Sequence, residues 1–176
     1  IKPLIGIEAY ITEDPDNLPK EQRTRDNYHM ILIAINNIGY KNLLWLISNA
    51  NRSNFYYKPR IYEKHLAARS EGIVATSGCL AGKVCRTLTG TTLQVKDLPT
   101  KDCYIEGRRL IERYAEIFKD RFYLELQDSR GHTDKLQELY NSNLVNLSKQ
   151  TGIPLVITAD AHYLTKEDKQ THNLLM

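Results

Sequence analysis

The stretch GIPLVITADAH, residues 152–162, holds the pattern on which the fold prediction rests. Residues 155–158 are apolar or β-branched, which predicts a short buried strand. A helical pattern over residues 134–150 precedes this strand and ends at Gly152, a common residue after the last turn of a helix. A helix followed directly by a buried strand with polar residues at its end is typical of an α/β domain.

The same alternation of helices and strands extends towards the N-terminus. Short runs rich in β-branched residues predict strands, and apolar residues three or four positions apart predict helices with one apolar face. We expect strands at residues 4–11, 28–35, 73–75, 122–126 and 155–158, and helices at 40–50, 62–68, 104–118 and 134–150. Residues 12–27 and 87–102 show neither period and are expected to be irregular. This order predicts a largely parallel sheet, closed or open.

Composition restricts the class of protein but names no partner. The chain has 176 residues, of which 41% are hydrophobic and 26% charged, as in a globular domain. It has no long apolar run and no signal-peptide pattern, so we expect a cytoplasmic protein without a membrane partner. Three cysteines, an odd number, argue against a disulfide framework. The formal net charge of +3 is too small to indicate nucleic-acid binding by itself.

Five side chains that can bind metals occur beside the predicted strands. Glu8 lies in an apolar run, where a buried carboxylate costs several kcal/mol unless it is paired or coordinates a cation. Asp160 and His162 follow the last strand two positions apart, so in extended backbone their side chains point to the same side. The other two are His29 and Cys79. Each residue also has an ordinary interpretation, as a surface carboxylate, a core histidine, a buried thiol or a polar turn.

The positions of these residues relative to the strands favour a common site. Glu8, Cys79 and the pair Asp160/His162 each follow a predicted strand, and strand ends gather at one face of an α/β domain. His29 begins its strand instead, so it reaches that face only if its strand runs antiparallel to the first. We therefore predict that all five residues line one cleft. The arginines of residues 108–113 are interpreted as a solvated helix face.

Five stretches, in order along the chain, resemble signatures of the PHP (polymerase and histidinol phosphatase) domain of bacterial DNA polymerase III alpha subunits. They are PLIGIEAY at 3–10, YHMILIA at 28–34, TSGCLAG at 76–82, FYLELQ at 122–127 and TADAHYL at 158–164. Two further stretches, GYKNL at 39–43 and FYYKPR at 55–60, favour the polymerase branch over stand-alone PHP phosphatases.

The resemblance implies a distorted (β/α)7 barrel of the PHP type with a polynuclear metal site in a cleft. Residues 1–176 would be an incomplete PHP domain, because the family's early His-x-His and Asp-His-Gly motifs are absent. By position, the metal ligands of the family correspond to Glu8, His29, Cys79, Asp160 and His162. Such mixed donors suit zinc, manganese or iron.

The resemblance also implies a function within a DNA-directed DNA polymerase that acts in DNA replication. In complete family members it implies a metal-dependent phosphodiesterase that proofreads as a 3′-5′ exonuclease, while the fragment itself is expected to be inactive. The implied partners are the DNA primer-template, a proofreading exonuclease subunit and other replicase subunits. Two alternatives remain: a non-catalytic scaffold that docks a separate proofreading exonuclease subunit, and a stand-alone PHP phosphatase.

Overall fold

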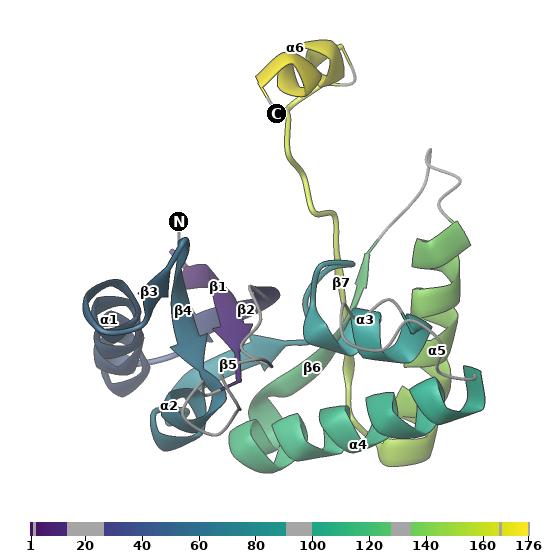
Figure 1. The fold of residues 1–176 in the computed structure, drawn as a ribbon, viewed down its shortest axis with the longest axis horizontal. Coiled ribbons are helices and arrows are strands. Elements are labelled where there is room, and N and C mark those ends of the chain that lie inside the picture. The colour runs from purple at the N-terminus through teal and green to yellow at the C-terminus, as the bar shows by residue number, and fades with distance from the viewer. Residues whose placement is uncertain (2, 14–26, 91–99, 128–134, 166, 176) are drawn as a thin grey trace.

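The computed structural model describes residues 1, 3–13, 27–90, 100–127, 135–165 and 167–175 (Figure 1). Within them, seven strands form one sheet in the order β3-β4-β1-β2-β5-β6-β7. The strands are β1 (Ile5–Thr12), β2 (Tyr28–Ala34), β3 (Phe55–Tyr56), β4 (Lys58–Tyr62), β5 (Ile73–Thr76), β6 (Phe122–Gln127) and β7 (Leu155–Thr158). The helices are α1 (Asn37–Arg52), α2 (Glu63–Ala68), α3 (Lys83–Thr89), α4 (Thr100–Phe118), α5 (Lys135–Thr151) and α6 (Asp168–Leu175), with a 3-10 turn at Lys119–Arg121.

Strand β2 runs against both of its neighbours in the sheet. It pairs antiparallel with β1 and with β5, and β3 pairs antiparallel with β4. The pairs β1–β4, β5–β6 and β6–β7 are parallel. Half of the described strand pairs are antiparallel, so the expectation of a largely parallel sheet is wrong. The alternation of strands and helices in the sequence does not settle strand direction, because an antiparallel pair can form without the long crossover that a parallel pair needs. The reversal also brings the first residues of β2 to the edge at which β1, β4 and β5 end.

Alternation along the strands gives the sheet two different faces. Ala9 and Ile11 of β1 and Met30 and Leu32 of β2 are buried and belong to the core. The core is completed by apolar residues of the helices: Leu43 and Leu46 of α1, Leu88 of α3, Ile111, Tyr114 and Phe118 of α4, and Leu144 and Leu147 of α5. The intervening residues of β1 and β2 point to the opposite face, which we call the site face.

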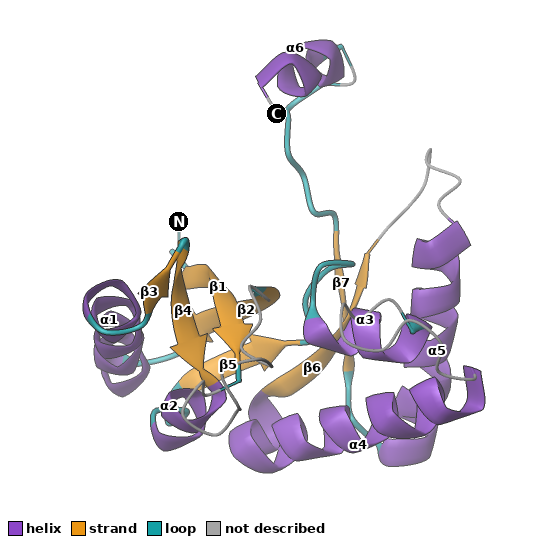
Figure 2. Cartoon of the chain, in the orientation of Figure 1, coloured by secondary structure: helices purple, strands orange, loops and turns teal. Residues whose placement is uncertain are grey.

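Helices α4 and α5 pack against β6, and α1 packs against β4 and β2. Figure 2 shows α3, α4 and α5 gathered around β6 and β7, with α1 beside β3 and β4 at the other end. Helix α6 stands apart from the rest of the domain, at the end of an extended segment that leaves β7 (Figure 1). No helix in the described part of the chain combines the length and the apolar character that crossing a membrane requires.

The structure confirms an α/β architecture and contains elements outside the expected ranges, among them helix α6. The hairpin of β3 and β4 and the helix α3 were not predicted, because both are short and the exposed aromatic residues of β3 do not alternate with polar ones. Residues 87–102 were expected to be irregular, but α3 extends to Thr89 and α4 begins at Thr100, while residues 91–99 lie outside the described part of the chain. In the described residues β3 and β7 remain sheet edges, so closure into a barrel stays a prediction.

Candidate metal centre

Glu8 and His29 meet across the antiparallel pair of β1 and β2. The register places Tyr10 opposite His29, so Glu8, two residues earlier on the same face of β1, is a diagonal neighbour of His29. Nδ1 of His29 lies 2.8 Å from Oε1 of Glu8. The ring of Tyr10 packs edge-on against the imidazole at a centroid distance of 5.3 Å. Because β2 runs antiparallel to β1, His29 at the start of β2 lies beside Glu8 and Tyr10, as the prediction of a common site needed.

The position expected for Glu8 within its strand was wrong. Strand β1 continues to Thr12, so Glu8 lies inside the strand and not at its end. The strand expected at residues 4–11 already contained Glu8 and matches the observed strand to within one residue, so the error lay in treating Glu8 as a strand-end residue. The carboxylate reaches the site by pointing out of the site face, half exposed, without being a strand-end residue.

Cys79 joins this pair from the turn after β5, the other neighbour of β2. Its Sγ lies 3.6 Å from Nδ1 of His29. Ligand atoms of Glu8, His29 and Cys79 all lie within 4.8 Å of one another. The group therefore spans three adjacent strands and presents a carboxylate, an imidazole and a thiol to one point.

The turn at residues 77–82 is tied to its surroundings by backbone and buried side-chain hydrogen bonds. The His29 N–H donates to the carbonyl of Ala81 over 3.2 Å. The buried hydroxyl of Tyr140 on α5 donates to Ser77 Oγ over 3.0 Å, and the same oxygen accepts the N–H of Glu125 over 2.9 Å. These hydrogen bonds tie the turn to β2, α5 and β6 and so hold Cys79 beside His29.

Burial raises the pKa of the Cys79 thiol above its ordinary value, and the negative charges of Asp160 and Glu8 raise this pKa further. A hydrogen bond with the backbone of Ala81 acts in the opposite direction. Without a cation, Cys79 is therefore a protonated thiol at neutral pH. Metal binding would require the thiol to release this proton, as thiolate ligation does in general.

Asp160 and His162 follow β7 as expected, but they do not belong to the group whose ligand atoms lie within 4.8 Å of one another. Asp160 is close enough to Cys79 for its charge to raise the thiol pKa. Its backbone has a left-handed φ of 46°, which breaks the extended geometry expected for the Asp160/His162 pair. The His162 ring packs against His172 of α6, with centroids 5.7 Å apart. Among the described residues, the cluster within ligand distance consists of Glu8, His29 and Cys79.

The chemistry of these three donors fits a transition metal. Thiolate and imidazole are preferred by zinc and iron, and carboxylate with imidazole also suits manganese. Glu8 is half exposed and His29 and Cys79 are partly buried, so the group opens towards solvent on the site face. The donor set alone does not select one metal.

Glu125 is a buried carboxylate of the site face that the sequence analysis did not single out. Its carboxylate accepts a hydrogen bond from Thr158 Oγ1 over 2.7 Å and a second, short one from Thr76 Oγ1. The side chain thereby joins β5, β6 and β7 at the edge where the strands end. Its position in an alternating strand, between the buried Leu124 and the partly buried Leu126, was the available signal.

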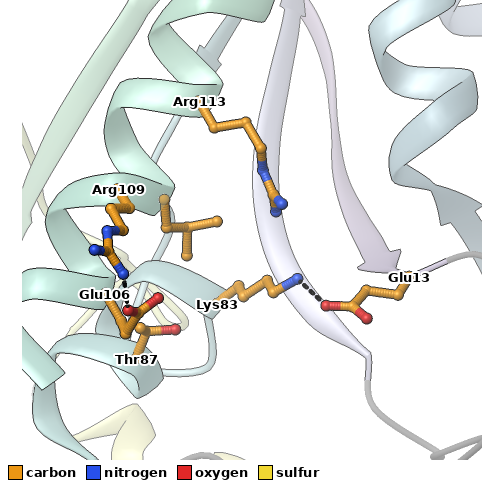
Figure 3. A pocket seen from close by; sticks show the side chains of 7 residues that line it. Glu13, Lys83, Thr87, Glu106, Arg109 and Arg113 are labelled. Atoms are coloured by element: carbon orange, nitrogen blue, oxygen red, sulfur yellow. Dashed lines mark hydrogen bonds and ion pairs between the residues drawn. The ribbon is translucent and has the colours of Figure 1, made fainter. Parts of the chain in front are cut away.

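A separate cavity of about 300 Å³ lies between α3, α4 and the residue that follows β1 (Figure 3). Its charged side chains form ion pairs, in part with Glu63, which lies outside the lining. Lys83 Nζ contacts Glu13 over 2.9 Å and Glu63 over 2.8 Å. Arg113 contacts Glu63 over 2.7 Å, and Arg109 pairs with Glu106 in the same helix. Each of these three cations is thus paired with a carboxylate.

A family model described as the PHP domain matches residues 1–129. Several curated relatives are DNA polymerase III alpha subunits. That of Helicobacter pylori strain J99 is 39% identical over 176 residues, and that of Borreliella burgdorferi is 36% identical over 177 residues. The subunit of Aquifex aeolicus is 36% identical over 182 residues.

These alignments cover 100% of this chain and 14% of each relative. The chain thus spans about one seventh of the length of the relatives that it matches. The resemblance drawn from the five sequence signatures is confirmed, and because the family model covers most of the residues, the chain belongs to the PHP domain family.

Proposed function

We propose that this chain acts as the PHP domain of a bacterial replicative DNA polymerase, of the DNA polymerase III alpha type, and that its metal centre hydrolyses phosphodiester bonds at DNA 3′ ends. The observation that carries the proposal is the convergence of Glu8, His29 and Cys79 within 4.8 Å. Similarity to polymerase alpha subunits over the whole chain supports the replicative context.

In this proposal Glu8, His29 and Cys79 hold the metal, and Asp160 and His162 complete the ligand set. A bound divalent metal would supply Lewis-acid chemistry, which activates water and stabilises negative charge during phosphodiester hydrolysis. The chain itself supplies the rigid support. Tyr140 and Ser77 fix the turn that carries Cys79, and Tyr10 packs against the imidazole of His29. Fixed ligand orientation of this kind is required for both metal affinity and activity.

The proposed partners follow from the same context. They are the DNA primer-template, reached through the parent polymerase, and a proofreading exonuclease subunit with other replicase subunits. The proposed location is the cytoplasm, where a bacterial replicase works.

A second candidate function is a scaffold without catalysis, which docks a separate exonuclease subunit. The contact between His162 and His172 favours it, because this contact directs one expected ligand towards α6. The two candidates differ in one measurable property, namely metal-dependent hydrolysis by the polymerase chain alone.

The test is Asp160→Asn in the full-length polymerase that carries this chain, with no separate proofreading subunit present. We expect loss of metal-dependent 3′-5′ hydrolysis of a mismatched primer, while nucleotide incorporation is retained because it uses a different site. Asp120→Asn is the matched control, since the Asp120 side chain is 92% exposed at a distant turn. Equal hydrolysis by Asp160→Asn and the unmodified protein would refute the catalytic proposal and leave the scaffold.

A further inference from the structure

We propose that the hairpin of β3 and β4, together with Tyr10, forms a binding track for single-stranded DNA that leads to the metal centre. This inference rests on the proposed function, because it supplies the substrate contacts of the same site. The track residues are Tyr56, Tyr57, Lys58 and Tyr10, with Arg60 beneath Tyr56.

The register of the sheet places these residues on one face. Tyr56 pairs with Lys58 across the hairpin, and Arg60 of β4 lies beside Tyr10 of β1. Alternation along β1 puts Tyr10 on the same face as Glu8, and Tyr10 is opposite His29. The hairpin aromatic residue, the two cations and the metal-centre residues therefore all belong to the site face.

Two sets of side-chain contacts lie between the hairpin and the metal centre, and backbone pairing of β3, β4 and β1 joins them. The Arg60 guanidinium lies over the Tyr56 ring at 4.8 Å, and the Tyr56 and Tyr57 rings are 4.8 Å apart. Lys58 Nζ lies 5.4 Å from the centre of the Tyr10 ring. Tyr10 in turn packs against His29. From β3 to β2 the track crosses three strand spacings, a span of roughly 14 Å.

Two features of the hairpin are unusual for a structural edge. Tyr56 and Tyr57 are adjacent in the hairpin and are 44% and 62% exposed, so it presents two neighbouring aromatic rings to solvent. Tyr57 also adopts a left-handed φ of 59°, a conformation that costs about 1–2 kcal/mol in a residue other than glycine. A strained backbone that presents an exposed ring favours a binding role.

The chemistry of the track fits an unpaired nucleic-acid strand. Residues 55–62 contain no acidic residue, and the exposed Lys58 suits a phosphate backbone, whereas Arg60 is only 8% exposed and supports the Tyr56 ring. Exposed tyrosine rings can stack on the bases of a single strand, because those bases have free faces. In a duplex the neighbouring base pairs cover these faces. Exonucleolytic removal of a 3′ nucleotide requires such an unpaired end at the metal centre.

The test measures binding of a fluorescein-labelled oligothymidine of about 12 nucleotides, a length within the range of known single-strand sites. Anisotropy is recorded with the 176-residue chain in EDTA at low salt, so that no hydrolysis occurs. We expect Tyr56→Leu/Tyr57→Leu to weaken binding about tenfold or more, the effect of losing a stacked base. The variant Tyr56→Phe/Tyr57→Phe keeps the ring faces and should bind like the unmodified chain.

Matched controls separate the track from general surface effects. Tyr40→Leu removes an exposed tyrosine on α1, and Lys149→Ala removes an exposed lysine on α5; neither should change affinity. Lys58→Ala should weaken binding and reduce its salt dependence, because one phosphate contact is lost. Circular dichroism confirms that each variant is folded.

The outcomes distinguish this inference from the proposed function. The track is overturned if the unmodified chain does not bind the oligonucleotide, or if the leucine and phenylalanine pairs bind equally well. Hydrolysis by the full-length protein would then stand independently. Conversely, track-dependent binding by the chain, together with no hydrolysis by the full-length polymerase under any added metal, would support the track and refute the catalytic proposal.

Discussion

Gly78 and His29 approach so closely that a Cβ atom on Gly78 would lie 2.5 Å from the carbonyl oxygen of His29. Gly78 also has a left-handed φ of 76°. The turn that carries Cys79 can therefore contact the start of β2 only because residue 78 is glycine. The metal centre depends on this contact, since it sets the distance between the thiol and the imidazole.

We expect Gly78→Ala to destabilise the chain by about 2–4 kcal/mol, from left-handed strain together with steric overlap. Gly152→Ala is the matched control: its φ is 75°, but a Cβ there would meet no atom within 4 Å. Only strain of about 1–2 kcal/mol applies at that position. Thermal unfolding measures the difference, and equal destabilisation of the two variants would contradict the close approach.

Tyr140→Phe should lower the metal affinity of the centre as well as its stability. Burial raises the pKa of Tyr140 well above its ordinary value, so its hydroxyl remains a donor to Ser77. Losing this bond costs about 1 kcal/mol and frees the turn that carries Cys79. Tyr114→Phe removes an equally buried hydroxyl, bonded to Glu63 over 3.0 Å, away from the centre.

Calorimetric titration with Zn²⁺ or Mn²⁺ compares the two tyrosine variants. The expected result is weaker binding by Tyr140→Phe and unchanged binding by Tyr114→Phe. If both variants lose affinity equally, Tyr140 acts through overall stability and does not position Cys79.

The sequence predicted the strands that depend on neighbouring residues in the chain, and it misled where the structure depends on pairing between segments far apart in the chain. Tyr28–Ala34 is a strand because its apolar β-branched run is buried on the sheet. Leu155–Thr158 is a strand as expected, but the expectation that it would be buried was wrong, because in the described residues it lies at the edge of the sheet and Ile157 is 74% exposed. The direction of β2 is set by its partners β1 and β5, which no local pattern specifies.

In the candidate site, too, the sequence identified residues but could not predict orientations that depend on distant contacts. His29 and Cys79 could be selected from the sequence because polar residues in apolar or glycine-rich surroundings stand out. The orientation of His162 could not, because it depends on the backbone of Asp160 and on the ring of His172. Glu125 is buried by Thr76 and Thr158 of the neighbouring strands, and local alternation does not reveal that these two threonines lie beside it.

Metal binding should raise the melting temperature of the native protein. A ligand that binds only the folded state stabilises it by about 2.7 kcal/mol at a free concentration one hundred times its Kd. His29→Ala should remove this shift. His65→Ala is the control, since His65 packs against Trp45 and Tyr62 outside the centre and should keep the shift. A persistent shift in His29→Ala would exclude the imidazole as a ligand.

Glu13 should contribute to stability in a pH-dependent manner. Its hydrogen bond to Lys83, and then the charge of Lys83, lower its pKa below the ordinary 4.5. The unfolded chain therefore takes up the proton first as pH falls. Stability from this contact is full above about pH 4.5 and is lost as pH falls through the lower folded-state pKa.

Glu13→Gln should cost about 0.5 kcal/mol at neutral pH, a small value because Glu13 is half exposed and solvent screens the pair. The cost should disappear at a pH below the folded-state pKa. Urea unfolding from pH 3 to 7 measures it, with Glu138→Gln on α5 as an exposed control. A cost that does not vary with pH would show that charge is not involved.

The reversed strand β2 also determines when the centre can exist during folding. Glu8 and His29 are 21 residues apart and His29 and Cys79 are 50 apart, so the donors meet only after two loops have closed. Non-local pairings of this kind form slowly. A nascent chain in which β2 has not yet inserted between β1 and β5 holds no assembled donor set, so cation binding indicates that these three strands have paired.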